Sequence, residues 1–156
     1  AQRLEQKLID LGKHTYVLDG DNLRSGINKD LRFSPMDRVE NIRRTAEVAS
    51  LFVSAGFLVL ISLISPYKRD RKKARAIRPE VFKEIFIKAS IEECERRDVK
   101  GLYAKARSGK IKNFTGLTAP YEEPDKPELI IDTEKNGIIE CSKLLEKFVE
   151  KEFGKK

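Results

Sequence analysis

Apolar residues change their spacing several times along the chain, and each change marks a predicted element. The first segment carries Leu4, Leu8 and Leu11 on one helical face, and the glycine that follows favours the end of that helix. Residues 15–18 are then typical of a short buried strand. This strand leads directly into Asp-Gly-Asp-Asn at residues 19–22, so carboxylates stand at its C-terminal end.

A long helix is predicted from Ser34 to about Ala55. Ser34 suits the N-cap, Pro35 suits the first helical position, and Asp37 favours the positive end of the helix dipole. Residues 57–64 then form an apolar run of strand length that ends at a Ser-Pro pair. Such a run is expected for a parallel strand that is covered on both faces.

Further elements follow in the second half of the chain. Residues 85–87 and 129–131 are strand candidates, and Ser90 with Glu93 forms a capping-box pattern that begins a helix. The final helix, residues 137–152, carries an apolar stripe made of Ile138, Cys141, Leu145 and Phe148. Strands that alternate with helices indicate an α/β fold with a parallel sheet, in which ligands bind at the carboxyl ends of the strands.

Length and composition agree with one ordinary domain, residues 1–156. Charged residues make up 37% of the chain, and 32 Lys and Arg exceed 25 Asp and Glu, which gives a net charge of +7. The apolar share of 40% is enough for a packed core. The longest mainly apolar stretch, residues 55–64, is much shorter than the roughly 20 residues that a membrane helix needs. We therefore expect no membrane partner.

Cysteine and histidine are too few for several kinds of site. Cys94 and Cys141 lie far apart without metal-ligand spacing, so neither a disulfide scaffold nor a zinc site is indicated, and a reducing, cytoplasmic setting is favoured. His14 is the only histidine, which excludes chemistry that needs a His pair. We expect any catalysis to rest on carboxylates, Lys or Arg, hydroxyl groups or a bound metal.

Three polar clusters fall where the predicted topology places a binding crevice. They are residues 19–24, residues 64–66 and residues 97–116, each of which follows a predicted strand or lies in the long connection after one. A plain turn stays an alternative interpretation of the Asp-Gly-Asp-Asn segment, because these residue types tolerate left-handed backbone. Its place at the end of a strand favours a functional site.

Basic residues on the long helix form a pattern that suits anions. Arg38, Asn41 and Ile42 share one helical face. Arginine offers a planar fork to phosphate or sulfate, and asparagine offers an amide to a base or ribose. For Arg43 and Arg44 we expect that at least one belongs to a solvated face of the helix.

Two other basic segments call for different interpretations. Residues 68–75 are mostly Lys and Arg, but no interleaved aromatic residues provide a stacking platform, so a solvated helix face is favoured over nucleic-acid binding. Residues 100–109 place a short cationic helix between two glycines, and Phe114 and Gly116 follow. This arrangement is typical of a lid that closes over an anionic ligand.

Together these segments resemble the adenylylsulfate (APS) kinase family across essentially the whole chain. The matching stretches are residues 18–24, 33–34, 37–44, 64–67, 97–103, 105–107 and 113–116. The resemblance implies a P-loop NTPase-like three-layer α/β sandwich with a parallel sheet and a lid segment. It also implies transfer of the γ-phosphoryl group of ATP to the 3′-hydroxyl of APS, giving 3′-phosphoadenylylsulfate in sulfate assimilation, with Mg²⁺ as the cofactor.

The residue roles of the family carry over to the matching positions. Asp19 and Asp21 would serve the metal-water shell, and Asp21 would act as the general base for the acceptor hydroxyl. The APS-binding residues would be Asp21, Asn22, Arg24, Phe33, Arg38, Asn41, Ile64, Ser65, Lys100 and Phe114, with the two phenylalanines on either side of the adenine. The ATP-binding residues would be Arg97, Lys100 and Asn136. Ser65 would either be catalytic, as a phosphoserine intermediate, or only bind APS, and direct in-line transfer needs no covalent step.

The family pattern also includes a strand followed by Gly-x-x-Gly-x-Gly-Lys-Ser/Thr, which is absent from these 156 residues. One expectation is that the sequence is part of a longer protein that supplies this first strand and P-loop. The alternative is an inactive APS-kinase-like regulatory module that binds APS or phosphoadenylylsulfate. The resemblance further implies ATP and APS as small-molecule partners, a homodimer, and possible fusion to or association with ATP sulfurylase.

Overall fold

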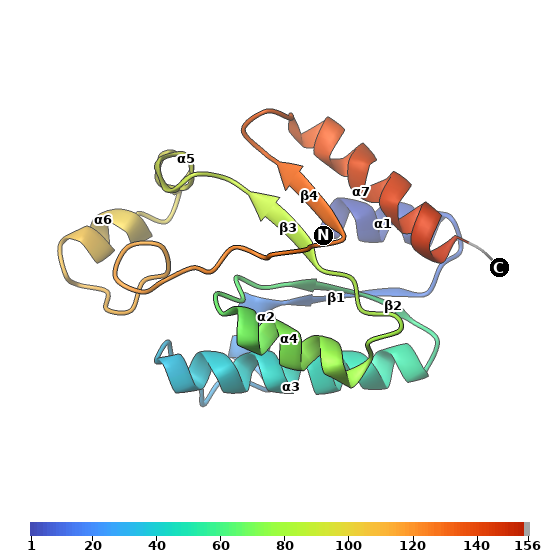
Figure 1. Cartoon of the computed structure of the whole chain (residues 1–156), viewed down its shortest axis with the longest axis horizontal. Helices are drawn as coiled ribbons and strands as arrows, with labels where there is room; N and C mark the ends of the chain where they lie inside the picture. Colours follow the sequence, from blue (N-terminus) through green and yellow to red (C-terminus); the bar gives the residue numbers. More distant parts are fainter. Residues whose placement is uncertain (155–156) are drawn as a thin grey trace. The chain divides into compact units, whose positions relative to one another are not determined.

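The computed structural model describes residues 1–154 and divides into two compact units (Figure 1). The first unit runs from Ala1 to Phe82, and the second begins at Lys83. Both contain parallel strands connected by helices, which is the α/β organisation that the sequence predicts. One domain over residues 1–156 stays a prediction, and each unit is described by itself.

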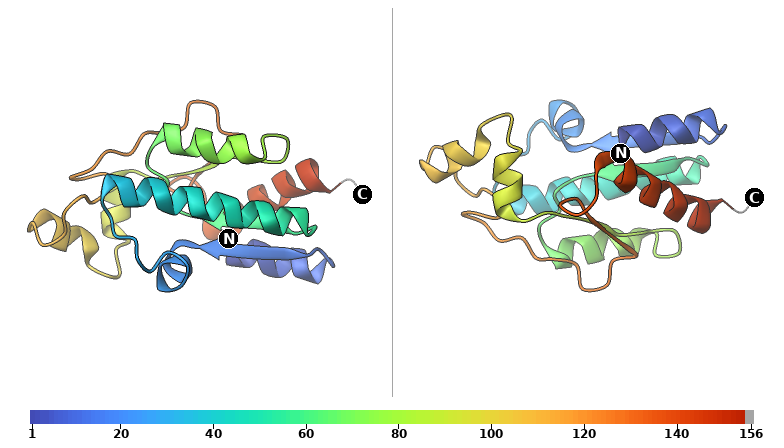
Figure 2. Two further views of the ribbon diagram at one scale, coloured as in Figure 1. Left: turned by 90° about the horizontal axis from the view of Figure 1, so that it is seen from below. Right: turned by 90° about the horizontal axis from the view of Figure 1, so that it is seen from above.

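The first unit is built on one parallel pair of strands. Its elements are, in chain order, α1 (Gln2–Asp10), β1 (Thr15–Asp19), α2 (Gly20–Ser25), α3 (Pro35–Ser54), β2 (Leu58–Ser62) and α4 (Lys68–Ile77). The pairing runs from Thr15 opposite Leu58 to Asp19 opposite Ser62. Helix α1 lies over one face of the pair, while α3 and α4, which contact each other, lie on the other side (Figures 1 and 2). The carboxyl ends of both strands, with the segments that follow them, therefore lie side by side.

A small apolar core fixes this end of the first unit. Leu18 of β1, Leu23 of α2 and Ala49 of α3 are buried against one another, and Val48 and Val59 pack around them. Full burial of a leucine side chain contributes about 1.5–3 kcal/mol. Because Leu18 directly precedes Asp19 and Leu23 lies one turn into α2, this packing sets the position of the polar segment between them.

The start of α3 confirms the capping prediction. Ser34 is the N-cap with its side chain accepting a hydrogen bond from the backbone N–H of Asp37 at 3.1 Å, and Pro35 is the first helical residue. The helix ends at Ser54, with Ala55 as its C-cap. None of the helices in the described part of the chain, α3 included, combines the length and the apolar character of a transmembrane span.

The second unit repeats the parallel strand pairing. Its elements are β3 (Ile85–Lys88), α5 (Ile91–Arg96), α6 (Leu102–Arg107), β4 (Leu129–Asp132) and α7 (Ile138–Phe153). Ile85 lies opposite Leu129, and Lys88 lies opposite Asp132. The buried apolar residues of this unit are Phe86, Ala106, Ile131 and Val149. The predicted strands at 85–87 and 129–131, and the helix that follows each, are therefore confirmed.

Several apolar positions differ from the sequence prediction. Leu11 lies beyond the end of α1 and is 67% exposed, and Ile138 lies in the first turn of α7 and is 69% exposed. Val149, outside the predicted stripe, is buried instead. Residues of β2 are half-buried or exposed rather than covered on both faces, because β2 has β1 as its only strand neighbour within residues 1–154. Helical periodicity identified which residues share one face of a helix, but not the residue at which that face ceases to be buried.

The capping box before α5 forms only in part. Ser90 accepts a hydrogen bond from the backbone N–H of Glu93, as predicted. The Glu93 carboxylate does not return to the Ser90 N–H, because it pairs with Arg96 and Arg97. The Ser90 N–H donates instead to Glu134 Oε1 at 2.5 Å, which links α5 to the turn after β4.

Candidate functional site

A polar hollow lies at the carboxyl ends of β1 and β2 in the first unit. It has a volume of about 210 Å³ and lies among segments that follow both strands and the first turns of α3. The residues that line it are Asp19, Gly20, Asp21, Arg24, Phe33, Arg38, Asn41, Ile42, Ser62, Leu63, Ile64, Ser65 and Pro66. A second hollow, about 460 Å³, is lined by α7 and its N-cap alone and contains none of the predicted site residues. The first hollow is therefore the candidate site.

Two carboxylates mark the point where β1 becomes α2. Asp19 is the N-cap of α2, with extended backbone, and its Oδ1 accepts a hydrogen bond from the Asp21 N–H at 2.9 Å. Asp21 lies in the first turn of the helix and is exposed at the hollow. Between them, a Cβ on Gly20 would lie 2.9 Å from Leu63 Cδ2, so glycine lets the two strand ends approach closely.

The two carboxylates fit one particular kind of metal binding. No group of three or more His, Cys, Asp and Glu that could hold a metal ion occurs within residues 1–154. In kinases Mg²⁺ is usually held by one or two carboxylates together with substrate phosphates and water, rather than by a complete protein cage. Asp19 and Asp21 supply oxygen donors of that type and number.

Two arginines and one aromatic ring form one wall of the hollow. The Arg24 guanidinium lies 4.5 Å from the centre of the Phe33 ring, and the Arg38 guanidinium lies 5.7 Å from it. Arg38 Nε also donates to the Phe33 carbonyl at 3.2 Å. Arg38 is buried, and this burial is the largest influence that lowers the pKa of its guanidinium; Tyr67 opposes the shift and Arg24 adds to it. The wall thus combines positive charge with a half-exposed ring.

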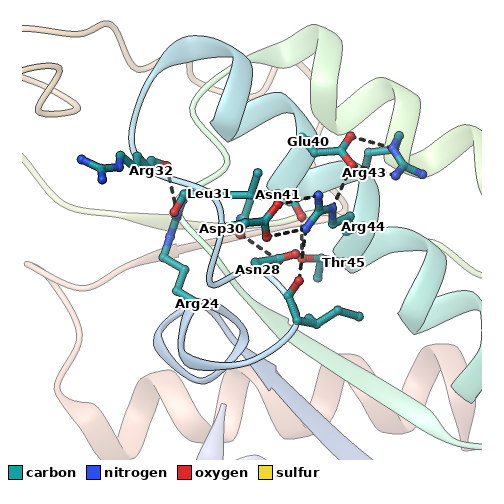
Figure 3. Close-up of polar contacts among 11 residues, drawn as sticks. Arg24, Asn28, Asp30, Leu31, Arg32, Glu40, Asn41, Arg43, Arg44 and Thr45 are labelled. Atoms are coloured by element: carbon teal, nitrogen blue, oxygen red, sulfur yellow. Dashed lines mark hydrogen bonds and ion pairs between the residues drawn. The ribbon is translucent and has the colours of Figure 1, made fainter.

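Asn41 is held by a buried polar contact behind the hollow (Figure 3). Its Oδ1 accepts a hydrogen bond from Asn28 Nδ2 at 3.0 Å, and Asn28 is completely buried. Thr45, also buried, donates its hydroxyl to the Asn41 carbonyl at 2.7 Å. The Asn28 contact holds the Asn41 side chain, and Asn41 lines the hollow from α3.

Ser65 occupies a strained position after β2. Its φ angle is +44°, in the left-handed region that non-glycine residues rarely adopt. Arg71 of α4, whose side chain is buried, donates Nη1 to the Ser65 carbonyl at 2.6 Å. The neighbouring Ile64 is 64% exposed at the hollow. Left-handed backbone in a non-glycine residue is common at ligand sites, where the surrounding structure maintains it.

The lid candidate belongs to the second unit. Asp98 accepts the backbone N–H groups of Lys100 at 3.2 Å and Tyr103 at 2.8 Å, and Gly101 between them has a φ angle of +62°. The Phe114 ring packs edge-on against Tyr103 with centroids 4.8 Å apart. Burial, followed by the nearby Cys94, raises the pKa of Tyr103 to about 12. The short cationic helix predicted here is confirmed as α6.

Two of the three predicted ATP-side residues border the same turn of the second unit. Arg97 donates to the hydroxyl and the carbonyl of Thr133 at 3.0 and 2.8 Å. Asn136 Nδ2 donates to the Asp132 carbonyl at 2.9 Å. Arg97 and Asn136 therefore both border the turn that follows β4.

The structure brings together most of the predicted APS-side residues of the first unit. Asn22 is the exception, since it is exposed and does not line the hollow. Lys100, Phe114, Arg97 and Asn136 lie in the second unit, so the predicted sandwich of Phe33 and Phe114 stays a prediction.

Sequence reasoning missed two supporting residues. The basic run at 68–75 was expected to be a solvated helix face, yet Asp70 and Arg71 are both buried. Asn28 lies in a turn with no periodic pattern, so nothing in the sequence indicated that it would be buried. For Arg71 the one available signal was that it lies close in sequence to the Ser65-Pro66 pair that follows β2.

Comparisons with known proteins identify the family of this chain. The sequence model described as "Adenylylsulphate kinase" matches residues 1–132. The chain is 52% identical over 152 residues to an adenylyl-sulfate kinase of Geotalea uraniireducens, covering 97% of this chain and 73% of that protein. It is 57% identical over 136 residues to an adenylyl-sulfate kinase of Staphylococcus epidermidis, covering 86% and 68%.

A solved structure gives the same result. It is the Mycobacterium tuberculosis APS kinase CysC in complex with AMPPNP and APS, with a TM-score of 0.89 and 44% identity, covering 96% of this chain and 88% of that one. The family match extends over most of the chain, and the relatives are aligned over most of their own length. The chain belongs to the adenylylsulphate kinase family.

Proposed function

We propose that this chain is an adenylyl-sulfate kinase that phosphorylates the 3′-hydroxyl of APS with ATP. The observation that carries the proposal is the hollow in which two carboxylates, two arginines and one aromatic ring converge at the carboxyl ends of β1 and β2. The naming of close relatives as adenylyl-sulfate kinases supports it and favours an active kinase over the alternative of an inactive regulatory module. Binding of AMPPNP and APS by the Mycobacterium tuberculosis enzyme supports the choice of substrates.

The wall formed by Arg24, Arg38 and Phe33 is proposed to recognise APS. Arg24 and Arg38 are positioned to neutralise the phosphosulfate, since arginine presents paired N–H donors to oxyanions. Phe33 offers a half-exposed ring face for the adenine, and Phe114 is proposed to cover the opposite face. Asn41, Ile64 and Ser65 complete this set through amide, apolar and backbone contacts, with Asn22 and Lys100 at its margin.

Asp21 is the proposed general base. Its carboxylate accepts the proton from the 3′-hydroxyl as the bond from the 3′-oxygen to the γ-phosphorus forms and the bond to the β,γ-bridging oxygen breaks, which releases ADP. A positioned base of this kind contributes about 10²- to 10⁴-fold to a rate. Most of the remaining acceleration in phosphoryl transfer comes from alignment and charge neutralisation.

Mg²⁺ is the proposed cofactor, with Asp19 and Asp21 holding it through water. When bound, it neutralises charge on the ATP phosphates. Arg97, Lys100 and Asn136 are the proposed ATP-side residues, because Arg97 and Asn136 border one turn and Lys100 lies in the lid segment. A homodimer, and fusion to or association with ATP sulfurylase, stay predictions of the family resemblance.

Ser65 is proposed to bind APS rather than to carry a phosphoryl group. Arg71 holds its carbonyl, and its backbone is fixed in a left-handed conformation. Direct in-line transfer requires no serine nucleophile. Near-normal turnover of Ser65→Ala is the expected result, and loss of turnover with retained APS binding would support an obligatory phosphoserine.

The test is an assay of 3′-phosphoadenylylsulfate formation from ATP and APS with Mg²⁺. The natural full-length protein is used, and its intact mass is measured first, because the family pattern includes a P-loop. Formation of phosphoadenylylsulfate and ADP in equal amounts is expected. Binding of APS without any turnover by that protein would contradict the kinase and indicate a regulatory module.

A further inference from the structure

The loop between α2 and α3, residues 26–34, is called here the Phe33 loop. It carries no regular helix or strand, and its internal backbone contacts are turns such as Lys29 N–H to the Gly26 carbonyl and Leu31 N–H to the Asn28 carbonyl. Phe33 lies at its far end, directly before α3. A loop of this kind depends on side-chain contacts from neighbouring helices to keep one conformation.

One arginine of α3 joins most of this loop to the helix (Figure 3). Arg44 forms a two-point ion pair with Asp30, at 2.7 Å from Nη1 to Oδ1 and 2.9 Å from Nη2 to Oδ2. The same Nη1 donates to the Ile27 carbonyl at 3.1 Å, and Nε donates to Glu40 Oε1 at 2.8 Å. Arg44 thus uses each of its guanidinium nitrogens and contacts the loop at two separate points.

The far end of the loop is held by residues of the hollow itself. Arg24 Nη1 donates to the carbonyls of Leu31 and Arg32 at 3.2 and 3.0 Å, and Arg38 donates to the Phe33 carbonyl. Arg44 does not line the hollow. The loop therefore has a ligand-facing anchor in Arg24 and Arg38, a buried contact from Asn28 to Asn41, and a remote anchor in Arg44.

The adjacent Arg43 provides an internal comparison. It carries the same charge and pairs with the same Glu40, at 2.8 Å, but its side chain is 57% exposed and its ion pair lies within α3. The Arg44 side chain is only 27% exposed. The two neighbours therefore differ in whether they reach the Phe33 loop.

We propose that Arg44 is a positioning residue for APS. By pairing with Asp30 and the Ile27 carbonyl, it fixes the Phe33 loop. The loop in turn positions the Phe33 ring and the Arg24 contacts that receive the nucleotide. This inference rests on the proposed kinase function. Arg44 acts through the loop and does not touch the substrate. Its removal leaves the catalytic carboxylates and the ATP-side residues unchanged, so its effect is confined to APS.

The test compares Arg44→Ala with Arg43→Ala in the full-length enzyme. Arg44→Ala is expected to raise the KM for APS about tenfold, which corresponds to about 1.4 kcal/mol. The kcat at saturating APS and the KM for ATP should stay within about twofold of wild type, because losing binding that is equal in the ground and transition states changes KM and not kcat. Arg43→Ala should leave all three constants unchanged.

Two further variants separate positioning from general stability. Arg44→Lys keeps the charge but cannot hold both Asp30 oxygens and the Ile27 carbonyl together, so an intermediate KM for APS is expected. Asp30→Asn removes the negative charge of the ion pair on the loop side. Because the Asp30 side chain is exposed, this change carries little risk to folding, and it should also raise the KM for APS.

Three results would overturn the proposal. They are equal KM values for APS in Arg44→Ala and Arg43→Ala, an unchanged KM in Asp30→Asn, and a parallel loss of kcat, ATP affinity and melting temperature in Arg44→Ala. Wild-type enzyme that forms no phosphoadenylylsulfate and binds no APS would instead contradict the proposed function.

Discussion

Polar side chains are held differently in the two units of the chain. Within residues 1–154 the buried polar and charged side chains all lie in the first unit: Thr15, Asn28, Arg38, Asn41, Thr45, Asp70 and Arg71. In the second unit the predicted ligand residues Arg97 and Lys100 are exposed, and the acid–base pairs Glu93–Arg96 and Glu95–Arg107 lie at the surface. Buried polar contacts such as Asn28–Asn41 and Arg71–Ser65 make a site rigid, whereas exposed pairs are easily exchanged for water.

This difference matches two tasks in one phosphoryl transfer. The first unit presents a hollow whose lining includes the buried side chains of Arg38 and Asn41, and fixed side chains lower the ordering cost of binding APS. The second unit carries the glycine-bracketed α6 segment, the predicted lid, whose Arg107 pairs with Glu95 at the surface. The contrast therefore predicts large effects from catalytic residues in the first unit and small effects from surface pairs in either unit.

The largest expected effect is that of Asp21→Ala. Turnover should fall about 10²- to 10⁴-fold because the proposed base is lost. APS binding should stay within about threefold, since Arg24, Phe33 and Arg38 still line the hollow and a factor of three is under 1 kcal/mol. Steady-state kinetics and calorimetric titration with APS measure the two quantities, with the isosteric Asp21→Asn as control. Unchanged turnover in either variant would refute the role of Asp21.

The rigid support of the first unit is tested by Arg71→Ala. The Ser65 carbonyl loses its 2.6 Å donor, and the free energy of unfolding should fall by about 1–3 kcal/mol. Lys72→Ala on the same helix, where the side chain is exposed, should change it by less than about 0.5 kcal/mol. Urea unfolding measures both. Equal effects of the two variants would show that the buried guanidinium does not support the strand end.

The lid segment is tested by Gly101→Ala. A Cβ at this position meets no atom within 4 Å, so its effect comes from the φ angle of +62° alone, and about 1 kcal/mol of destabilisation is expected. Gly137, with φ of −70° and equally open space, is the matched control in the same unit. Thermal unfolding should separate Gly101→Ala from Gly137→Ala; the same melting temperature for both would argue against a required left-handed residue.

The smallest effects concern surface pairs. Arg43 and Arg44 lower the pKa of Glu40 to about 2, and Arg96 and Arg97 lower the pKa of Glu93 to about 2, from an ordinary value of 4.5. Because both folded-state pKa values lie below the ordinary value, the stabilisation is complete above about pH 4.5 and is lost as pH falls toward 2.

Unfolding free energies measured from pH 6 to pH 2 should therefore decline below about pH 4.5. Glu40→Gln and Glu93→Gln should each flatten that decline to a similar small extent, because both carboxylates are partly exposed and screened by solvent. A much larger effect of one variant would show that its unit relies on surface charge.

The regular elements around the site could be predicted from the sequence because local patterns determine them. Ser34 and Pro35 identified the start of α3, and the two parallel strand pairs followed from short apolar runs between helices. The carboxylates at the end of β1 were found because topology places strand ends at one edge. These predictions needed only spacing and residue type.

The supporting contacts could not be predicted because they depend on tertiary distances. Arg43 and Arg44 look alike in the sequence, and only the structure shows that Arg44 reaches Asp30, fourteen residues away along the chain. Arg71 lies in a run of basic residues, and its burial depends on the path of the chain after β2. Asn28 is a turn residue by composition but is buried by its contact with Asn41.

The most direct test of the account is calorimetric titration of APS into wild-type protein and Arg38→Ala. The account predicts saturable one-site binding to wild type and affinity at least about tenfold weaker in Arg38→Ala, since a hydrogen bond to a charged group contributes about 1.5–3 kcal/mol. Arg43→Ala, with the same loss of charge, should bind APS as wild type does. Equal affinity of Arg38→Ala and wild type, or no binding to wild type, would contradict an APS site in the first unit.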